Sequence, residues 1–212
     1  MKINQDSIAG YNVSTGFNGT RMWKSSDPKV RRCPECKFRL DFLSTNQEYT
    51  FKKSFNPKVA GVGPSVSTTA PLSYTYDICA IASAGFKEFC DAQGYQGLEF
   101  APFSNDYSHF HLISHNIIRI DAEKSKLRFG KRCPTCHNYA YTVFRNPPVC
   151  YALQGEYPGD GIYRSDVLFA DGDDKHPLMI IGPETKEKFK TAGFKKLAYH
   201  VVYRSEEAIA ID

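Results

Sequence analysis

"YDICAIASAGFKEFCDAQGYQGLEFAPF" (residues 76–103) predicts a strand, a helix and a second strand in direct succession. The apolar run at 76–81 is typical of a short strand. Ser83 is a suitable N-cap, and a helix running to about Gln93 would place Phe86 among the apolar residues of one face. Gly94 predicts the end of the helix, and the alternation in "GLEFAPF" predicts the second strand.

"HPLMIIGPETKEKFKTAGFKKLAYHVV" (residues 176–202) predicts the same succession near the end of the chain. A strand at 178–181 precedes Pro183, a residue that suits the first turn of a helix. The helix is expected to run to about Ala192 and to end at Gly193. "KKLAYHVV" alternates as a strand does.

The two units match each other at an offset of 99 residues. The matching pairs are Lys87 with Lys186, Glu88 with Glu187, Gly94 with Gly193, Tyr95 with Phe194, Leu98 with Leu197 and Phe100 with Tyr199. A Cys-Pro-x-Cys motif also recurs, at an offset of 100 residues. This order of motif, unit, motif, unit favours an internal duplication with pseudo-repeats at about 25–105 and 125–205. The alternative is a chance match between two units of a common type.

The chain of 212 residues is long enough to bury a core, and 42% of its residues are hydrophobic. We therefore expect one domain over residues 1–212, of the α+β class. It would have two similar halves, each with a small antiparallel sheet and one helix. Residues 1–30 are polar and rich in turn residues, and residues 55–74 are typical of a long loop.

The repeated motif lies in "RRCPECKFRLDF" (residues 31–42) and in "GKRCPTCHNYAYTVF" (residues 130–144). A Cys-x-x-Cys turn brings two sulfurs within reach of one metal ion, and zinc prefers four such ligands in a tetrahedron. One motif supplies half of that set, and the other motif is the obvious source of the rest. We therefore predict that one structural zinc ion joins the two halves in a zinc-ribbon-like site. Its four ligands would be Cys33, Cys36, Cys133 and Cys136.

The binding free energy of zinc is large enough for such a long-range link. Closing a loop of about 100 residues costs roughly 4 kcal/mol of chain entropy. Structural zinc sites bind with an apparent free energy on the order of 10 kcal/mol or more. A shared site could therefore close the loop and still stabilise the fold.

Two other interpretations of the cysteine pairs remain open at this point. A redox Cys-x-x-Cys usually opens a helix, which lowers the pKa of its first thiol, whereas "KFRLDF" and "HNYAYTVF" alternate as strands do. The pairs could also be ordinary thiol turns or a decayed site. His137, next to Cys136, could replace one sulfur, although a solvated histidine is the simpler interpretation.

Two further groups have the residue types of a functional site but lack its spacing. His109 and His111 would share one face of a strand in "SHFHLISH", which suits a metal site but also a partly exposed strand. The acidic run at 171–174 lacks the spacing of a calcium loop and indicates a solvated turn. No Ser/His/Asp or Cys/His arrangement and no phosphate-binding loop stands out, so we do not expect an enzyme.

The formal net charge of +4 permits contact with nucleic acid but does not suggest it, because no single stretch concentrates Lys and Arg.

The first residues, "MKINQDSIAGYN", contain no apolar run, which predicts neither a signal peptide nor a membrane span. The expected location is the cytoplasm, where thiols stay reduced. The seven cysteines form two close pairs and three singles, which does not suggest a disulfide framework.

The chain resembles the double-CxxCG-motif family of bacterial toxin-immunity proteins in the order of its landmarks. These landmarks are "CPEC" at 33–36, the helix that ends at Gly94 with "GLEF" after it, "CPTC" at 133–136, "DGIYRSDVLF" at 160–169 and "PLMIIGPETKEKFKTAGFKKLAYH" at 177–200. The resemblance implies an immunity protein that binds and neutralises a cognate toxin. It implies roles for the four cysteines of the two motifs and for no other residue.

One departure from the family motif concerns the turn after each cysteine pair. The family motif ends in glycine, whereas this chain has Lys37 and His137. Glycine there would allow a positive φ angle and a close approach of the backbone to sulfur.

The alternative function is a zinc-dependent nucleic-acid-binding or regulatory protein, which requires a strongly basic face. A metalloenzyme with a histidine site would require an open position on the metal.

Overall fold

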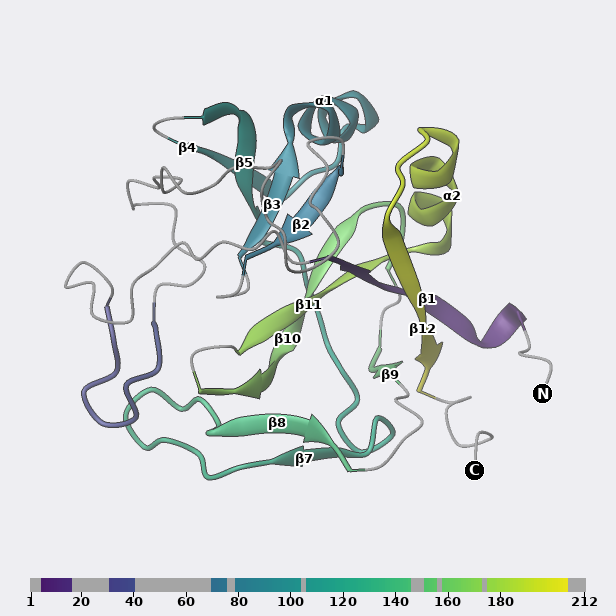
Figure 1. Cartoon of the computed structure of the whole chain (residues 1–212). Coiled ribbons are helices and arrows are strands. Elements are labelled where there is room, and N and C mark those ends of the chain that lie inside the picture. Colours follow the sequence, from purple (N-terminus) through teal and green to yellow (C-terminus); the bar gives the residue numbers. More distant parts are fainter. Residues whose placement is uncertain are drawn as a thin grey trace.

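A computed structural model describes residues 5–16, 31–40, 70–75, 79–103, 106–145, 151–155, 158–172 and 175–205. In these residues the fold is mixed α+β, with two sheets and two α-helices (Figure 1). None of the described helices is both long and apolar enough to cross a membrane.

The larger sheet has eight strands in the described part of the chain, in the order β7-β8-β10-β11-β1-β12-β9, with β6 paired to β10. These strands are β1 (Ile8–Thr15), β6 (Ile117–Ile118), β7 (Leu127–Phe129), β8 (Tyr141–Phe144), β9 (Tyr151–Leu153), β10 (Ile162–Asp171), β11 (His176–Ile181) and β12 (Leu197–Arg204). A short 3-10 helix, Gln5–Ser7, precedes β1. Helix α2 (Pro183–Thr191) connects β11 to β12.

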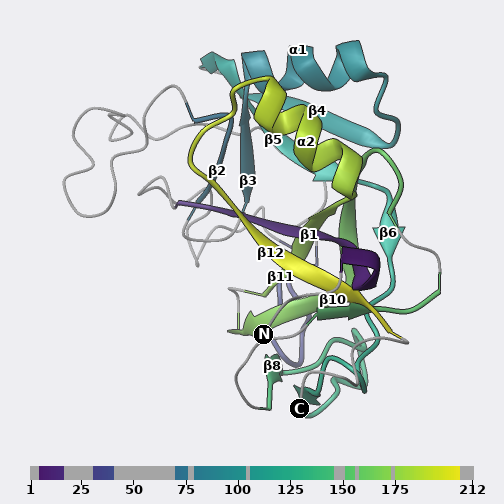
Figure 2. The ribbon, with the colours of Figure 1, turned by 90° about the vertical axis from the view of Figure 1, so that its right-hand side faces the viewer.

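The smaller sheet has four described strands in the order β2-β3-β5-β4. These strands are β2 (Leu72–Tyr74), β3 (Ala80–Ser83), β4 (Leu98–Phe103) and β5 (Asp106–Ser114). Helix α1 (Ala84–Gln93) connects β3 to β4. Figure 2 shows α1 beside α2, so that the two helices meet although they belong to different sheets.

Each helix connects two strands that are not neighbours, because a third strand lies between them. In the smaller sheet, β5 lies between β3 and β4 and is antiparallel to both. In the larger sheet, β1 lies between β11 and β12 and is antiparallel to both. The two strand–helix–strand units therefore have the same topology. The inserted strand of the smaller sheet, β5, directly follows its unit in the chain, whereas that of the larger sheet, β1, is the first strand of the chain.

The strand registers of the two units also agree at the offset of 99 residues. Ser114 pairs with Leu98, and Thr15 pairs with Leu197. The register on the other side of the inserted strand agrees in the same way, since His111 pairs with Ile81 and Asn12 pairs with Ile180. β1 therefore occupies in the larger sheet the place that β5 occupies in the smaller one.

At the end of each inserted strand, a hydroxyl side chain donates an equivalent hydrogen bond to a strand of the other sheet. The hydroxyl of Thr15 donates to the carbonyl of Leu72 on β2, at 2.8 Å. The hydroxyl of Ser114 donates to the carbonyl of Ile162 on β10, at 2.9 Å. β2 and β10 are antiparallel to β3 and β11 respectively. These bonds connect the two sheets, because Thr15 and Leu72 lie in different sheets, as do Ser114 and Ile162.

The helix ends lie close to where the sequence predicts them. The Ser83 hydroxyl accepts a hydrogen bond from the Phe86 N–H, as an N-cap does. Gly94 ends α1 with a φ of 68°, and Gly193 follows α2 with a φ of 74°. In both helices the N–H of the residue after the glycine donates to the carbonyl five positions earlier, from Tyr95 to Cys90 and from Phe194 to Phe189, a Schellman-type ending.

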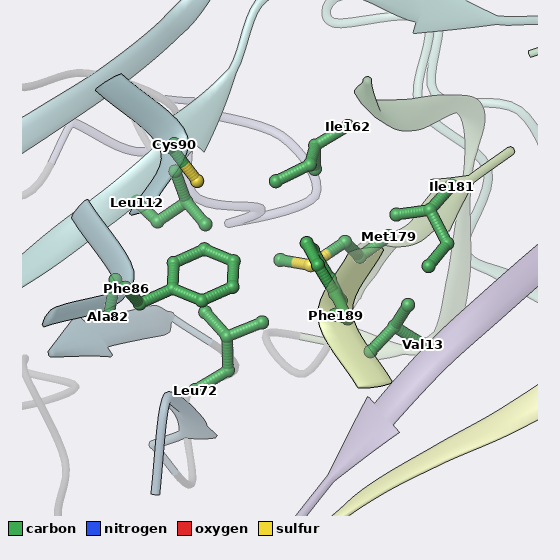
Figure 3. Close-up of a cluster of buried hydrophobic side chains, with 10 residues drawn as sticks. All are labelled: Val13, Leu72, Ala82, Phe86, Cys90, Leu112, Ile162, Met179, Ile181 and Phe189. Carbon is green, nitrogen blue, oxygen red and sulfur yellow. The ribbon is translucent and has the colours of Figure 1, made fainter. Parts of the chain in front are cut away.

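The main core lies where the two helices meet. Phe86 on α1 and Phe189 on α2 are both fully buried, with ring centroids 5.4 Å apart in an edge-to-face arrangement. Figure 3 shows these rings among residues of both sheets. The buried cluster consists of Val13, Leu72, Ala82, Phe86, Cys90, Leu112, Ile162, Met179, Ile181 and Phe189. A second cluster, which includes Leu153 and Ile180, fills the other side of the larger sheet.

The structure corrects three expectations about secondary structure. The polar first segment contains the eight-residue strand β1, whose buried positions do not alternate simply. Residues 72–74, expected to end a long loop, form β2, while 55–69 lie outside the described residues. The strand expected from residue 37 onward is absent from 37–40, because those residues belong to a tight hairpin. The part of that expectation at 41–43 lies outside the described residues.

Replacing Phe189 with Ala should lower the free energy of unfolding by about 3–5 kcal/mol, because the ring is fully buried and packs against Phe86, Phe89 and Phe194. Urea denaturation of the purified protein would measure the change. Lys190→Ala on the exposed side of α2 is the matched control, and its free energy of unfolding should stay within about 0.5 kcal/mol of the wild-type value. A loss below about 1 kcal/mol for Phe189→Ala would contradict the packing described here.

Candidate metal centre

Residues 31–40 form a tight hairpin around the first cysteine pair, which we name the first knuckle. The N–H of Cys33 donates to the carbonyl of Phe38 at 2.8 Å, and the N–H of Lys37 donates to the carbonyl of Cys33 at 3.0 Å. Arg32 and Arg39 form an antiparallel bridge at the base of the hairpin. The backbone therefore holds the two cysteines on one compact turn.

Residues 131–140, the second knuckle, have the same hydrogen bonds at an offset of 100 residues. The N–H of Cys133 donates to the carbonyl of Asn138, and the N–H of His137 donates to the carbonyl of Cys133, both at 2.9 Å. The bridge at its base joins Arg132 and Tyr139. The two motifs thus have the same local structure as well as the same spacing.

The residue after each second cysteine adopts the left-handed conformation. The φ angle is 63° at Lys37 and 60° at His137. Side chains other than glycine pay about 1–2 kcal/mol for this conformation. A hydrogen bond from an arginine side chain to the carbonyl of that residue supports it in both knuckles, from Arg32 to Lys37 and from Arg132 to His137.

The two knuckles face each other and bring four thiols together. The sulfurs of Cys33 and Cys133 are 3.7 Å apart, and those of Cys36 and Cys136 are 3.4 Å apart. All four sulfurs lie within 4.8 Å of one another. A tetrahedral ion with metal–sulfur bonds of about 2.3 Å requires sulfurs roughly 3.8 Å apart. The cluster could therefore hold one metal ion.

The cluster is half-buried, with its inner thiols shielded from water. Cys33 is fully buried and Cys133 is 7% exposed, whereas Cys36 is exposed. The N–H of Cys36 is the main cause that lowers the pKa of Cys33 to about 7, with a further contribution from the N–H of Glu35. Partial desolvation raises the pKa of Cys36 to about 12, and its contacts with the other three thiols act in the same direction. A bound cation would favour the thiolate form of all four, because metal-bound thiols lose their protons.

Contacts outside the thiols also connect the knuckles. The hydroxyl of Thr135 in the second knuckle donates to the carboxylate of Glu35 in the first, at 2.8 Å. Lys175, which is only 5% exposed, donates to the carbonyl of Tyr139, and its ammonium lies 4.1 Å from the ring centroid of Phe38. Lys175 therefore connects both knuckles to the start of β11.

The histidines that the sequence offered as metal ligands do not belong to the described group that could hold a metal. Among the described residues, the group of His, Cys, Asp or Glu that could hold a metal is Cys33, Cys36, Cys133 and Cys136. His109 and His111 lie on β5, and the ring of His109 is hydrogen-bonded to the hydroxyl of Ser108. His137 contributes its backbone to the second knuckle, and its side chain is exposed.

The local structure of the pairs disfavours a redox role. Neither pair begins a helix; both lie in turns at 34–36 and 134–136. The electrostatic effect of a helix N-terminus on the first thiol is therefore missing. The closest sulfur contacts also run between the two knuckles, from 33 to 133 and from 36 to 136.

Two features of the site were not predicted from the sequence. One is the buried position of Lys175 between the knuckles, and the other is the bond between Glu35 and Thr135. The sequence did contain an indication of the bond, since Glu35 and Thr135 occupy the same place in "CPEC" and "CPTC". Lys175 is far from both motifs in sequence and gave no signal of its own.

Comparisons with protein-family models, with curated proteins and with solved structures found no match for this chain.

The purified protein should contain about one zinc ion per chain, and each of the four cysteines should be necessary for it. Cys133→Ser should abolish the metal as fully as Cys33→Ser, since a single knuckle supplies two ligands. Elemental analysis after dialysis would measure the content. Cys90→Ala, which removes a buried thiol of the core, is the control and should keep the metal. Full retention in a variant that lacks one pair would rule out the shared site.

His137→Gly should raise the free energy of unfolding by about 0.5–1 kcal/mol, because glycine adopts a positive φ without strain. Its greater entropy in the unfolded chain offsets part of the gain. His137→Val should lower the same quantity, since a β-branched side chain is poorly tolerated there. Both values come from urea denaturation of the metal-loaded protein. Equal stabilities for the two variants would show that this turn is not strained.

Proposed function

We propose that this chain is a cytoplasmic immunity protein that binds and neutralises a cognate bacterial toxin. One observation carries the proposal: the two motifs of the resemblance converge on one four-thiol cluster. The departure of the sequence from the family motif does not weaken it. Lys37 and His137 stand where the family has glycine, and both adopt the positive φ that glycine favours.

The metal in this proposal is a structural zinc ion in a zinc-ribbon-like site. Four sulfur ligands form a closed set for tetrahedral zinc and leave no position for a substrate or a water. The ion would hold together two knuckles that lie 100 residues apart in sequence. Its contribution is to stability and shape, which is what a binding protein requires.

We further propose that the two halves arose by duplication and exchanged their first strands. The common topology, the equal registers and the two equivalent knuckles support this origin. The repeated units would then begin at β1 and β5, earlier than the limits that the sequence suggests. A relative with a single such half should form a two-fold dimer by exchanging that strand. A single-half relative whose first strand pairs within its own sheet would contradict the exchange.

The alternative, a zinc-dependent nucleic-acid-binding protein, is favoured by one observation. The described residues of the two knuckles, together with Lys175, contain seven Lys or Arg and a single Glu. These charges lie in three separate stretches of sequence, and the fold brings the two knuckles and Lys175 together. Binding to nucleic acid would then weaken steeply with salt.

Co-expression with the toxin encoded beside this gene should restore growth of a host that the toxin alone inhibits. The protein should also co-purify with that toxin as one stable complex. A variant with Cys33 and Cys133 both changed to Ser should protect less, because the zinc link would be lost. A variant with Cys90→Ala is the control. Full growth inhibition in the presence of the folded wild-type protein, with no complex formed, would refute the proposal.

A further inference from the structure

A pocket of about 630 Å³ opens between the two knuckles, beside the thiol cluster. Cys36 and Cys133 form part of its wall, and Gly172 after β10 and Lys175 before β11 also line it. The volume lies in the range of pockets that hold small ligands or a few side chains of a partner. The proposed structural role of the metal does not use this space.

The charged side chains on the pocket wall are mainly cationic. Lys37, Lys131 and Arg132 are exposed there, and Lys175 is buried at its side. Lys37 and Arg132 each donate to one backbone carbonyl of a knuckle, from Lys37 to Pro34 and from Arg132 to His137. An ammonium has three donors and a guanidinium has five, so these groups keep donors for a ligand.

Among the described residues of the pocket wall, the opposing negative charge is small. Glu35 lines the pocket, but Thr135 donates a hydrogen bond to its carboxylate. A zinc ion with four thiolates would add a net charge of about −2. The six Lys and Arg of the knuckles, with Lys175 as the seventh cation, still exceed these charges. Among the described residues that line the pocket, cationic side chains therefore outnumber acidic ones, with Lys37, Lys131, Arg132 and Lys175 against Glu35.

One exposed aromatic ring accompanies the cations. Phe38 and Tyr139 both line the pocket; Tyr139 is 38% exposed, whereas Phe38 is only 4% exposed. Its ring packs against Phe129 with centroids 4.6 Å apart, which holds it in place. Rigid aromatic surface next to cationic groups is typical of protein-binding hot spots. The pocket is thus suited to a ligand with both negative charge and apolar surface.

Most lysines of the described helices are paired with acidic side chains, and Lys186 lies over the ring of Tyr11. Lys87 is paired with Asp91, Lys188 with Asp160 and Glu184, and Lys190 with Glu187. A nucleic-acid duplex carries one charge per ~1.7 Å of its axis and needs a long basic stripe. Basic groups confined to one pocket fit a short cluster of carboxylates better.

We propose that the pocket between the knuckles binds an acidic segment of the partner protein, with its carboxylates on Lys37, Lys131 and Arg132. This inference rests on the proposed function, since it names the surface with which the immunity protein binds its toxin. The metal then has a second effect, because it holds the two basic walls at a fixed separation.

The test uses the full, zinc-loaded chain and a fluorescein-labelled hexaglutamate peptide as the probe. Fluorescence anisotropy at about 50 mM and 200 mM salt should show binding that weakens with salt. A hexaglutamine peptide should bind at least about tenfold more weakly. The double variant Lys37→Glu, Lys131→Glu should also lose at least about tenfold in affinity for hexaglutamate while keeping its zinc.

The matched control is Lys190→Glu with Lys195→Glu, which makes the same change in net charge on exposed residues of and after α2. Its affinity for hexaglutamate should stay within about twofold of the wild type. No binding of hexaglutamate, or an equal loss in this control, would overturn the proposal. Tighter binding of a labelled ten-residue oligothymidylate than of the peptide would overturn it in favour of nucleic acid.

The outcome is distinguishable from that of the co-expression experiment. Protection by a protein that does not bind hexaglutamate would retain the immunity function and remove this pocket as its binding surface. Binding of hexaglutamate without protection would retain the pocket and remove the toxin as its partner.

Discussion

The gap between the two strands of each strand–helix–strand unit is the constraint on which the rest of the structure depends. β3 and β4 run in the same direction one strand apart, and so do β11 and β12. Their inward backbone groups need partners, because buried N–H and C=O groups without hydrogen bonds are costly. β5 fills the first gap and β1 fills the second. Each sheet is therefore completed by a strand that comes from outside its own unit.

The placement of β1 and β5 also connects the two sheets. Thr15 and Ser114, at the ends of the inserted strands, hydrogen-bond to strands of the opposite sheet. The helices then meet through Phe86 and Phe189. The knuckles, which follow β1 and β5 in the chain, meet elsewhere in the same fold and align their four sulfurs. The thiol cluster and the sheets thus join the same two halves at separate places.

Local patterns in the sequence were sufficient for the elements with strong end signals. Ser83 and Gly94 marked the ends of α1, and Pro183 and Gly193 marked those of α2, because capping depends on a few neighbouring residues. The four cysteines were found by spacing alone, and the structure brings them together. β1 was missed because its burial depends on both neighbours in a sheet, and one of them lies almost 190 residues away, at Leu197–Arg204. Lys175 was missed for the same kind of reason.

The sequence by itself determined the two strand–helix–strand units, their caps and the two cysteine turns, since these rest on interactions between residues close along the chain. Only the tertiary structure decided that β1 completes the larger sheet and that basic residues from distant stretches line one pocket. Each of these depends on which segments meet across about 100 residues or more. That choice is made by burial and hydrogen bonding of the whole fold, for which no local pattern carries a signal.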